Sequence, residues 1–393
     1  MVKKINFILA ANYANSITRL VVEYANQFAQ GGMDVHISYP VFNYIDKVAW
    51  VFDRKTGSSP GLCRRMDQFL RFWKYLMVDN FFKRSAPISW QGSMVHSLDP
   101  RVRLHRFWMW PSPRALPDAE VMVVMQNYFI PHLLFLPACK GKIIGAIHMD
   151  YEKARNEFDG HFLGWWEQIV RIEQHLRVPR FAVSSAAKMS AEVLGIHVDR
   201  VIHNGINLQE FNERGRKISD HAPLRVMLYC ALEVAKGHDF GCQVVRELKK
   251  IYTARQVRFI SIGLAKEEYK TLFDENLGYL HGQDYAAAYK RADIFIYPSL
   301  RDGFPAPPLE ALACGCALAT TAVPGVVEYG VHEKNCLISQ PNDIMAMVRN
   351  VRQLIDDPSL RGRLTKHGPT TAQEFDWHRA ATKLLDFMNE CVP

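Results

Sequence analysis

The sequence lacks the cysteine and metal-ligand patterns that define several protein classes. Its eight cysteines are scattered over 393 residues, with no Cys-x-x-Cys pair and no Cys/His cluster at zinc-ligand spacing. We interpret them as reduced core residues of a cytosolic protein. The chain also contains no internal repeat, no low-complexity segment and no Asp-x-Asp pair. The composition excludes a fibrous or collagen-like protein.

Long apolar runs are missing as well. The N-terminal sequence MVKKINFILAANYANS holds an apolar run of about five residues, which is too short for a secretory signal and instead predicts a first strand. The most apolar stretch, Val121 to Cys139, is broken by polar residues and prolines, whereas a membrane-spanning helix needs roughly 20 consecutive apolar residues. We therefore expect a cytoplasmic protein that does not cross a bilayer.

Acidic residues are scarce in one part of the chain. With 48% hydrophobic and 22% charged residues the sequence is ordinary globular material, which excludes a disordered protein. The length predicts two domains. The formal net charge is +8, and residues 61–115 account for nearly all of it, with ten Lys and Arg against three Asp. This segment requires an explanation of its own.

Short apolar runs alternate with helical patterns along the whole chain, which predicts parallel sheets covered by helices. In the first half we expect strands at 5–11, 34–40, 121–127, 142–149 and 180–185, and helices at 16–30 and 185–194. A polar linker is expected at 212–223. In the second half we expect strands at 224–230, 257–263, 279–282, 292–299 and 316–321, and helices at 239–252, through Tyr269, at 285–290 and from Leu309.

This pattern predicts an α/β fold of two Rossmann-like, doubly wound domains that face each other across a cleft. The N-terminal domain comprises 1–203 and the C-terminal domain 204–371, and the last helix, 372–393, packs back onto the first domain. Such folds bind ligands outside the carboxyl ends of their strands. We therefore look for the site in the loops that follow the strands.

The sharpest feature is a pair of carboxylates separated by seven residues, Asp302 and Glu310. A predicted strand opens into a Gly/Pro-rich loop that carries Asp302, and a helix expected near Leu309 carries Glu310 in its first turn. Both acids can then face one pocket and accept hydrogen bonds from the hydroxyls of a ligand. The alternative is a structural one: an acidic turn residue, and a glutamate that favours a helix N-terminus.

The run from Pro298 to Gly315 resembles the donor-binding segment of GT-B glycosyltransferases of family 4. That pattern is an acid, Gly-Phe, a Gly/Pro-containing loop and Glu-Ala-Met/Leu-Ala-x-Gly. The resemblance implies that Asp302 contacts the hydroxyls of the transferred sugar and that Glu310 binds the nucleotide ribose. Two departures from the pattern are Asp in place of the usual Glu at 302 and Pro305 in place of a common Gly, which removes one amide donor.

The resemblance extends to Lys236, which follows the strand predicted at 224–230 and takes the position of the family lysine that neutralises the nucleotide diphosphate. An arginine often found a few residues earlier is absent, because Cys230 and Ala231 stand there. Arg301 or a basic residue of the other domain is the candidate for this second cation.

Further positions are similar to the family more loosely. Asn204-Gly205 matches the hinge between the domains, and Phe375-Asp376-Trp377 matches the segment before the last helix. Asn15 and Ser16 take the place of a Gly-Gly loop, and His148 coincides with a histidine that faces the donor sugar; a satisfied structural histidine is the alternative. The resemblance assigns catalytic roles to His148, Asp302 and Lys236, and donor binding to Asn15, Ser16, Lys236, Gly263, His281, Asp302, Gly303, Phe304, Pro305, Ala306 and Glu310.

The implied function is a retaining, metal-independent transfer of a sugar from a nucleotide-diphosphate sugar to a hydroxyl of a glycan or lipid-linked acceptor. Bacterial surface polysaccharide assembly, of lipopolysaccharide or capsule, is the expected setting. No cofactor and no metal are expected, and Lys236 with backbone amides would hold the diphosphate. The alternatives are a weakly active or non-catalytic protein that binds sugar nucleotides or membranes, and a sugar-nucleotide epimerase of the same architecture.

The basic segment 62–110 is rich in aromatic residues. From Leu62 to Met77 the apolar positions fall on one helical stripe, while Arg64, Arg71 and Lys74 lie on the other side. The stripe comprises Leu62, Met66, Phe69, Trp73, Leu76 and Met77. A basic amphipathic helix of this kind favours peripheral binding to an anionic membrane surface on the cytoplasmic face. The alternative is a surface helix packed on its own domain; no nucleic-acid motif accompanies the charge.

Overall fold

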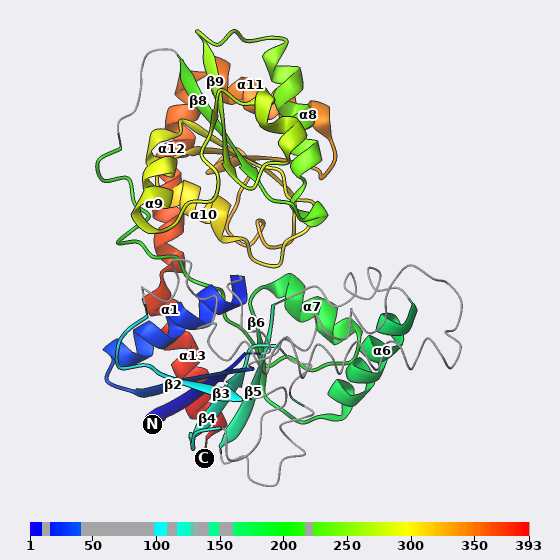
Figure 1. The fold of residues 1–393 in the computed structure, drawn as a ribbon, viewed down its shortest axis with the longest axis vertical. Coiled ribbons are helices and arrows are strands. Elements are labelled where there is room, and N and C mark those ends of the chain that lie inside the picture. Colours follow the sequence, from blue (N-terminus) through cyan, green and yellow to red (C-terminus); the bar gives the residue numbers. More distant parts are fainter. Residues whose placement is uncertain are drawn as a thin grey trace, which may run out of the picture.

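The structure is a computed structural model that describes residues 1–9, 16–40, 98–107, 116–126, 130, 141–148, 160–216 and 223–392. It contains two parallel sheets, one in each half of the molecule (Figure 1). The strands of the N-terminal sheet lie in the order β3-β2-β1-β4-β5-β6-β7. Their bounds are β1 Lys4–Ile8, β2 Asp34–Pro40, β3 Arg103–Phe107, β4 Val121–Val124, β5 Lys142–Ile147, β6 Arg180–Ala182 and β7 Arg200–Val201. The helices of this half are α1 Ser16–Gln30, α6 Gly160–His175 and α7 Ser185–Val193.

The strands of the C-terminal sheet lie in the order β10-β9-β8-β11-β12-β13. Their bounds are β8 Leu224–Cys230, β9 Val257–Gly263, β10 Glu275–Asn276, β11 Ile294–Tyr297, β12 Ala317–Thr321 and β13 Cys336–Ser339. The α-helices are α8 His238–Lys249, α9 Gly282–Arg291, α10 Ala306–Ala313, α11 Ile344–Asp356, α12 Pro358–Ala372 and α13 Trp377–Cys391. Short 3-10 helices lie at η5 Val234–Lys236, η6 Glu267–Leu272 and η7 Gln373–Phe375.

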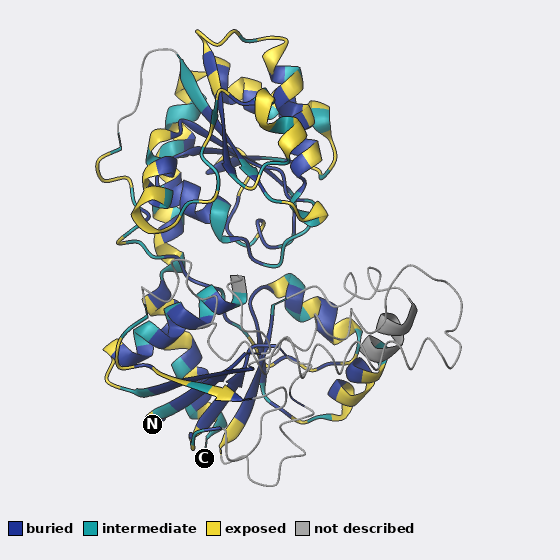
Figure 2. Ribbon diagram, in the orientation of Figure 1, coloured by how far each residue is buried: buried dark blue, intermediate teal, exposed yellow. Residues whose placement is uncertain are grey.

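The central strands of both sheets are buried on both faces, because helices cover each side (Figure 2). Every residue of β4, β11 and β12 is buried, which explains why their sequences are continuous apolar or small-residue runs without alternation. Both halves are thus doubly wound α/β units, as the sequence predicts. No helix in the described ranges is long and apolar enough to cross a membrane.

The chain crosses between the two halves twice, and the crossings lie side by side. The backbone N–H of Ile206 donates to the carbonyl of Phe375 at 2.8 Å. A Cβ atom on Gly205 would lie only 2.5 Å from Cα of Trp377, so this close approach requires glycine. Helix α13 then packs beside α1 in the N-terminal half (Figure 1), where Trp377 meets Tyr24 edge-on at 5.1 Å between ring centroids.

Most predicted elements are confirmed, and the exceptions have local causes. The strand predicted at 279–282 is wrong: β10 is Glu275–Asn276, and Gly278 then turns the chain with a φ of 67°. Helix α10 begins at Ala306 rather than near Leu309, because prolines are tolerated in the first turn of a helix. Glu310 is therefore in its second turn, and the predicted first-turn position is wrong.

Two further expectations change. Residues 103–107, which the sequence grouped with the basic aromatic segment, form the edge strand β3, parallel to β2. Of the rest of that segment, 62–97 and 108–110 lie outside the described residues, as does 217–222 of the predicted linker. The described part of that linker is anchored to the C-terminal half, since Arg216 donates to the carbonyl of Ala292 at 2.8 Å and of Cys314 at 3.1 Å. The six cysteines within the described ranges are free thiols.

Candidate active site

The loops that follow β8 and β11 bring Lys236 and Asp302 together. Lys236 Nζ donates to Oδ2 of Asp302 at 2.6 Å, and the hydroxyl of Tyr297 donates to the same oxygen at 2.5 Å. Both charged side chains are largely buried, with 24% and 13% of their surfaces exposed. Burial and the Asp302 charge hold the pKa of Tyr297 well above its usual value, so the phenol remains a donor. The predicted diphosphate cation and the predicted sugar-binding acid thus form one ion pair.

The backbone fixes this pair by clamping the two loops together. The carbonyl of Ala235 accepts hydrogen bonds from the backbone N–H groups of Leu300 and Arg301, at 2.8 and 3.1 Å. Gly237 follows Lys236 in the left-handed region with a φ of 66°. A Cβ atom there would lie 1.9 Å from the carbonyl oxygen of Pro298, so only glycine fits at this contact. The position of Lys236 therefore depends on the start of the loop that carries Asp302.

Glu310 lies at the centre of a second cluster, and its side chain is fully buried. Arg19 of α1 reaches it from the N-terminal half and donates from a terminal nitrogen to Oε1 at 2.8 Å. The hydroxyl of Tyr289 approaches Oε2 at 3.4 Å and is itself 2.8 Å from the hydroxyl of Tyr285. Both carboxylate oxygens of Glu310 are thus in contact with a donor, one from each half of the molecule.

Arg19 was not among the predicted site residues, although a signal was available. A basic residue of the other domain was one candidate for the second cation, and Arg19 lies in the first turn of the helix that follows β1. That turn faces the cleft because the carboxyl ends of parallel strands do. The specific partner, Glu310, is 291 residues away and is visible only in the structure.

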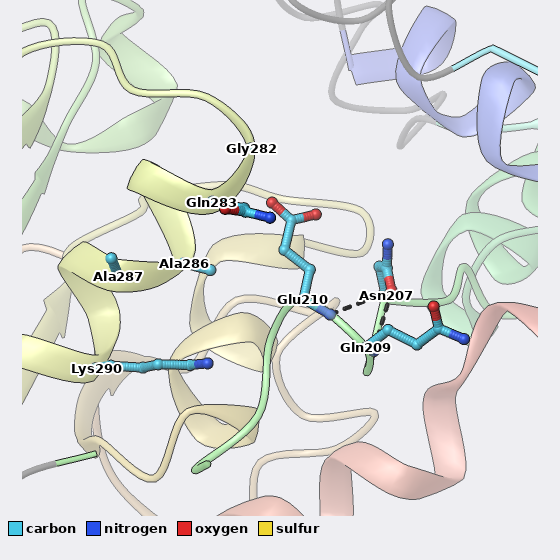
Figure 3. A pocket seen from close by; sticks show the side chains of 8 residues that line it. All are labelled: Asn207, Gln209, Glu210, Gly282, Gln283, Ala286, Ala287 and Lys290. Carbon is cyan, nitrogen blue, oxygen red and sulfur yellow. Dashed lines mark hydrogen bonds between the residues drawn. The ribbon is translucent and has the colours of Figure 1, made fainter. Parts of the chain in front are cut away.

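Two more glutamates and a cavity adjoin this cluster. Burial raises the pKa of Glu23 and of Glu210, and the Arg19 charge opposes the rise in both. Glu210 also lines a cavity of about 600 Å³. Figure 3 shows its carboxylate directed toward the start of α9, with Lys290 further along the helix. Asn207 holds this segment, because its Oδ1 accepts from the backbone N–H of Gln209 at 3.1 Å.

His148 directly follows β5 in the N-terminal half, and its backbone lies against the loop of the C-terminal half that carries Asp302. A Cβ atom on Gly303 would lie 2.7 Å from the carbonyl oxygen of His148, so the two backbones touch here. Both ring nitrogens of His148 are buried, without a hydrogen-bond partner among the described residues. Burial lowers the pKa of this imidazole to about 4, which leaves it neutral near pH 7.

The other predicted site residues have less direct positions. Phe304 is 9% exposed and its ring packs on His203, Tyr329 and Phe375, so its side chain belongs to an aromatic cluster of the core. The carbonyl of Pro305 accepts from the hydroxyl of Tyr329 at 2.8 Å.

Ala306 begins α10, Gly263 ends β9, and the ring of His281 packs edge-on against Tyr279. Asn15 lies outside the described residues. Of Ser16 only the backbone, which begins α1, is described.

The loops that follow the strands of the two sheets thus meet between the two halves. They carry an Asp–Lys pair in the C-terminal half and a Glu–Arg pair that joins the halves. Comparison with known proteins identifies this architecture. Sucrose-phosphate synthase of Thermosynechococcus elongatus superposes over 98% of both chains with a TM-score of 0.64 at 14% identity. HepE of Anabaena, solved with UDP-glucose, covers 98% of this chain and 99% of its own with a TM-score of 0.68 at 13% identity. The chain has the GT-B fold.

Part of the chain is also similar in sequence to known glycosyltransferases. Residues 210–371, which carry Lys236, Asp302 and Glu310, match the family described as glycosyl transferases group 1. O-antigen chain mannosyltransferase B of Escherichia coli is 33% identical over 110 residues, and this stretch spans 28% of that protein's length and 28% of this chain. A putative colanic acid biosynthesis glycosyltransferase, WcaL of Escherichia coli, is 22% identical over 81% of this chain and 79% of its own.

Proposed function

We propose that the protein transfers a sugar from a nucleotide-diphosphate sugar to a hydroxyl of a glycan or lipid-linked acceptor, in the assembly of a bacterial surface polysaccharide. The observation that carries the proposal is the Lys236–Asp302 pair, held between strand ends inside the segment that matches glycosyl transferases group 1. The names of two relatives, which refer to O-antigen and colanic acid, support the surface-polysaccharide setting.

In the proposed complex Lys236 binds the diphosphate and Asp302 accepts hydrogen bonds from the sugar. Both known contacts of Asp302 go to Oδ2, and a carboxylate has about four lone-pair sites. A donor whose diphosphate meets Lys236 then places its sugar beside Asp302, because the two side chains are only 2.6 Å apart. Glu310 binds the ribose hydroxyls, next to Arg19.

We propose retention of the anomeric configuration through front-face attack. The bond between the anomeric carbon and the diphosphate oxygen breaks while the acceptor oxygen bonds the same face of that carbon, and the leaving diphosphate takes the acceptor proton. Lys236 stabilises the charge that develops on the diphosphate. The neutral His148 imidazole, next to the Asp302–Gly303 loop, donates or accepts a hydrogen bond with the sugar or the acceptor.

We propose that this transfer needs no metal ion. The support is the sequence, which has no Asp-x-Asp pair to hold a diphosphate-bound cation. The cationic role falls to Lys236 and to backbone amides of the loops around it. We further propose that segment 62–110 meets the acceptor at an anionic membrane surface on the cytoplasmic face.

The test is donor turnover by purified protein with a panel of nucleotide-sugars, after a thermal-shift screen has identified the nucleotide-sugar that stabilises the protein most. We expect Asp302→Ala and Lys236→Ala each to lower turnover at least about a hundredfold while both remain folded. Addition of EDTA is expected to leave wild-type turnover unchanged.

Lys266 and Asp239 provide the matched control. They form another 2.6 Å Lys–Asp pair in the same half, at an exposed place on α8 and the loop after β9. Lys266→Ala is expected to retain wild-type turnover. Turnover that survives both site substitutions would contradict the site assignment, and turnover abolished by EDTA would contradict metal independence.

A further inference from the structure

Arg19 is a cation of the N-terminal half that reaches the predicted ribose-binding acid of the C-terminal half. Its guanidinium donates to Oε1 of Glu310 at 2.8 Å and lies 5.9 Å from the ring centroid of Phe211. Glu310 is fully buried, whereas 34% of the Arg19 side chain is exposed. Of the two side chains, that of Arg19 is therefore the one with surface that a ligand can contact.

The charges around Arg19 explain why it is held in place. The carboxylates of Glu23, Glu210 and Glu310 interact electrostatically with its guanidinium. Burial raises the pKa of Glu23 and of Glu210. One guanidinium thus offsets several carboxylates. An arginine has five N–H donors, and among the described residues its hydrogen bond to Glu310 uses one nitrogen. The remaining donors can bind an anion without breaking the contact with Glu310.

The proposed donor needs such a donor set. A nucleoside diphosphate carries at least two negative charges at neutral pH, and Lys236, which is paired with Asp302 at 2.6 Å, supplies one positive charge. Cys230 and Ala231 stand where a second cation was expected on the strand end. Among the described residues assigned to the diphosphate, Lys236 is therefore the cation that the loop after β8 supplies, and a second has to come from Arg301 or from the N-terminal half.

We propose that Arg19 is the second cation of the donor site and binds the diphosphate of a donor whose ribose is bound by Glu310. This inference rests on the proposed function. Ribose and diphosphate are joined through a single methylene and an ester oxygen, so an arginine bonded to the ribose-binding carboxylate lies within side-chain reach of the first phosphate. The planar guanidinium suits bidentate phosphate binding. Because Arg19 belongs to α1, donor binding also ties the two halves together.

The test is calorimetric binding of UDP, GDP and ADP, each compared with its nucleoside. We expect Arg19→Ala to weaken binding of the preferred diphosphate at least about tenfold, as for loss of a charged hydrogen bond, and to change nucleoside binding less than about twofold. Arg19→Lys is expected to recover part of the loss. Arg19→Gln, which keeps a polar stem, replaces the alanine variant if that variant does not fold.

Arg200 provides the matched control, because it pairs with Glu390 at 2.6 Å between β7 and α13, both of which belong to the N-terminal half. Arg200→Ala is expected to bind every probe as the wild type does. An equal loss of diphosphate and nucleoside binding in Arg19→Ala would overturn the proposal, because it would mean that Arg19 acts only by positioning Glu310. Unchanged or tighter diphosphate binding would overturn it as well.

A double-mutant cycle separates the phosphate contact from the Glu310 contact. In a Glu310→Gln background, Arg19→Ala is still expected to weaken diphosphate binding about tenfold; no further loss would overturn the proposal. A wild-type protein that binds none of the three diphosphates would refute the proposed function together with this inference. Diphosphate binding that is normal in wild type and in Arg19→Ala would refute the inference alone.

Discussion

The charged side chains of the site are paired with one another. Lys236 holds Asp302, and Arg19 holds Glu310, so each acid that the resemblance assigns to the donor already has a cation. An acid left unpaired in so buried a place would carry a large desolvation cost. The proposed nucleotide-sugar donor matches these pairs, with its phosphates near the cations and its hydroxyls near the acids.

His148 predicts a pH dependence of stability. Burial lowers its pKa from 6.5 to about 4 in the folded protein, so below pH 6.5 the unfolded chain binds the proton more readily. The free energy of unfolding therefore falls as the pH falls from 6.5 toward 4, by up to about 3 kcal/mol from this residue alone. His148→Phe keeps a ring and removes the titration. Urea unfolding at several pH values is expected to show a shallower decline for this variant, and parallel declines would contradict the assignment.

At the scale of elements, the sequence predicts what apolar periodicity encodes and misses what depends on neighbours. Strands buried on both faces, such as β4 and β11, are evident as apolar runs. The edge strand β3 is exposed at most of its residues, so its sequence resembles a charged surface segment. Asp302 and Glu310 were found because they lie in one contiguous pattern, and Lys236 because it follows a predicted strand in a position that resembles the family's. The pairing of Glu310 with Arg19 was not found, since a contact between α1 and α10 leaves no local signal.

Gly237, between the short helix η5 and α8, is a position where a single added methyl group is expected to lower stability strongly. Gly237→Ala would place Cβ 1.9 Å from the carbonyl oxygen of Pro298, at a φ of 66°. Gly278→Ala is the matched control, because Gly278 has a φ of 67° and no heavy atom within 4 Å of its Cβ position. We expect the control to lose about 1 kcal/mol of unfolding free energy and Gly237→Ala at least about twice as much, with donor binding lost as Lys236 moves.

Chemical denaturation and nucleotide titration of both variants measure these effects. Equal destabilisation of the two would mean that the loop after β8 relaxes away from Pro298, and the clamp between the two loops would then not position Lys236.

At the scale of the whole molecule, the two halves are joined by side-by-side crossings and by contacts such as Glu328, whose Oε1 accepts from the backbone N–H of Ser185 at 2.7 Å.

The structure also shows which basic residues of the segment 61–115 are paired with acids and which part of its positive charge is left. In the described part of the basic segment, Arg101 pairs with Asp99 and Arg103 with Asp34, each at 2.7 Å. These two arginines are therefore compensated within the fold. The charge that remains for an external surface belongs to residues 62–97 and 106–114, of which the structure describes only 106 and 107.

The basic segment 62–110 is predicted to bind an anionic membrane surface. Each basic residue near an anionic surface contributes about 1 kcal/mol, so neutralising Arg64, Arg65, Arg71 and Lys74 is expected to weaken binding to phosphatidylglycerol vesicles at least about tenfold. Zwitterionic phosphatidylcholine vesicles should bind neither protein, and added salt should weaken the wild-type interaction.

The control neutralises Arg255, Arg258, Arg363 and Lys366, which are exposed on the C-terminal half. Vesicle flotation measures both variants. Equal losses would show a nonspecific effect of net charge, and unchanged binding would make the segment an ordinary protein surface; donor binding should stay constant throughout, because the Lys236 and Glu310 clusters lie on other elements.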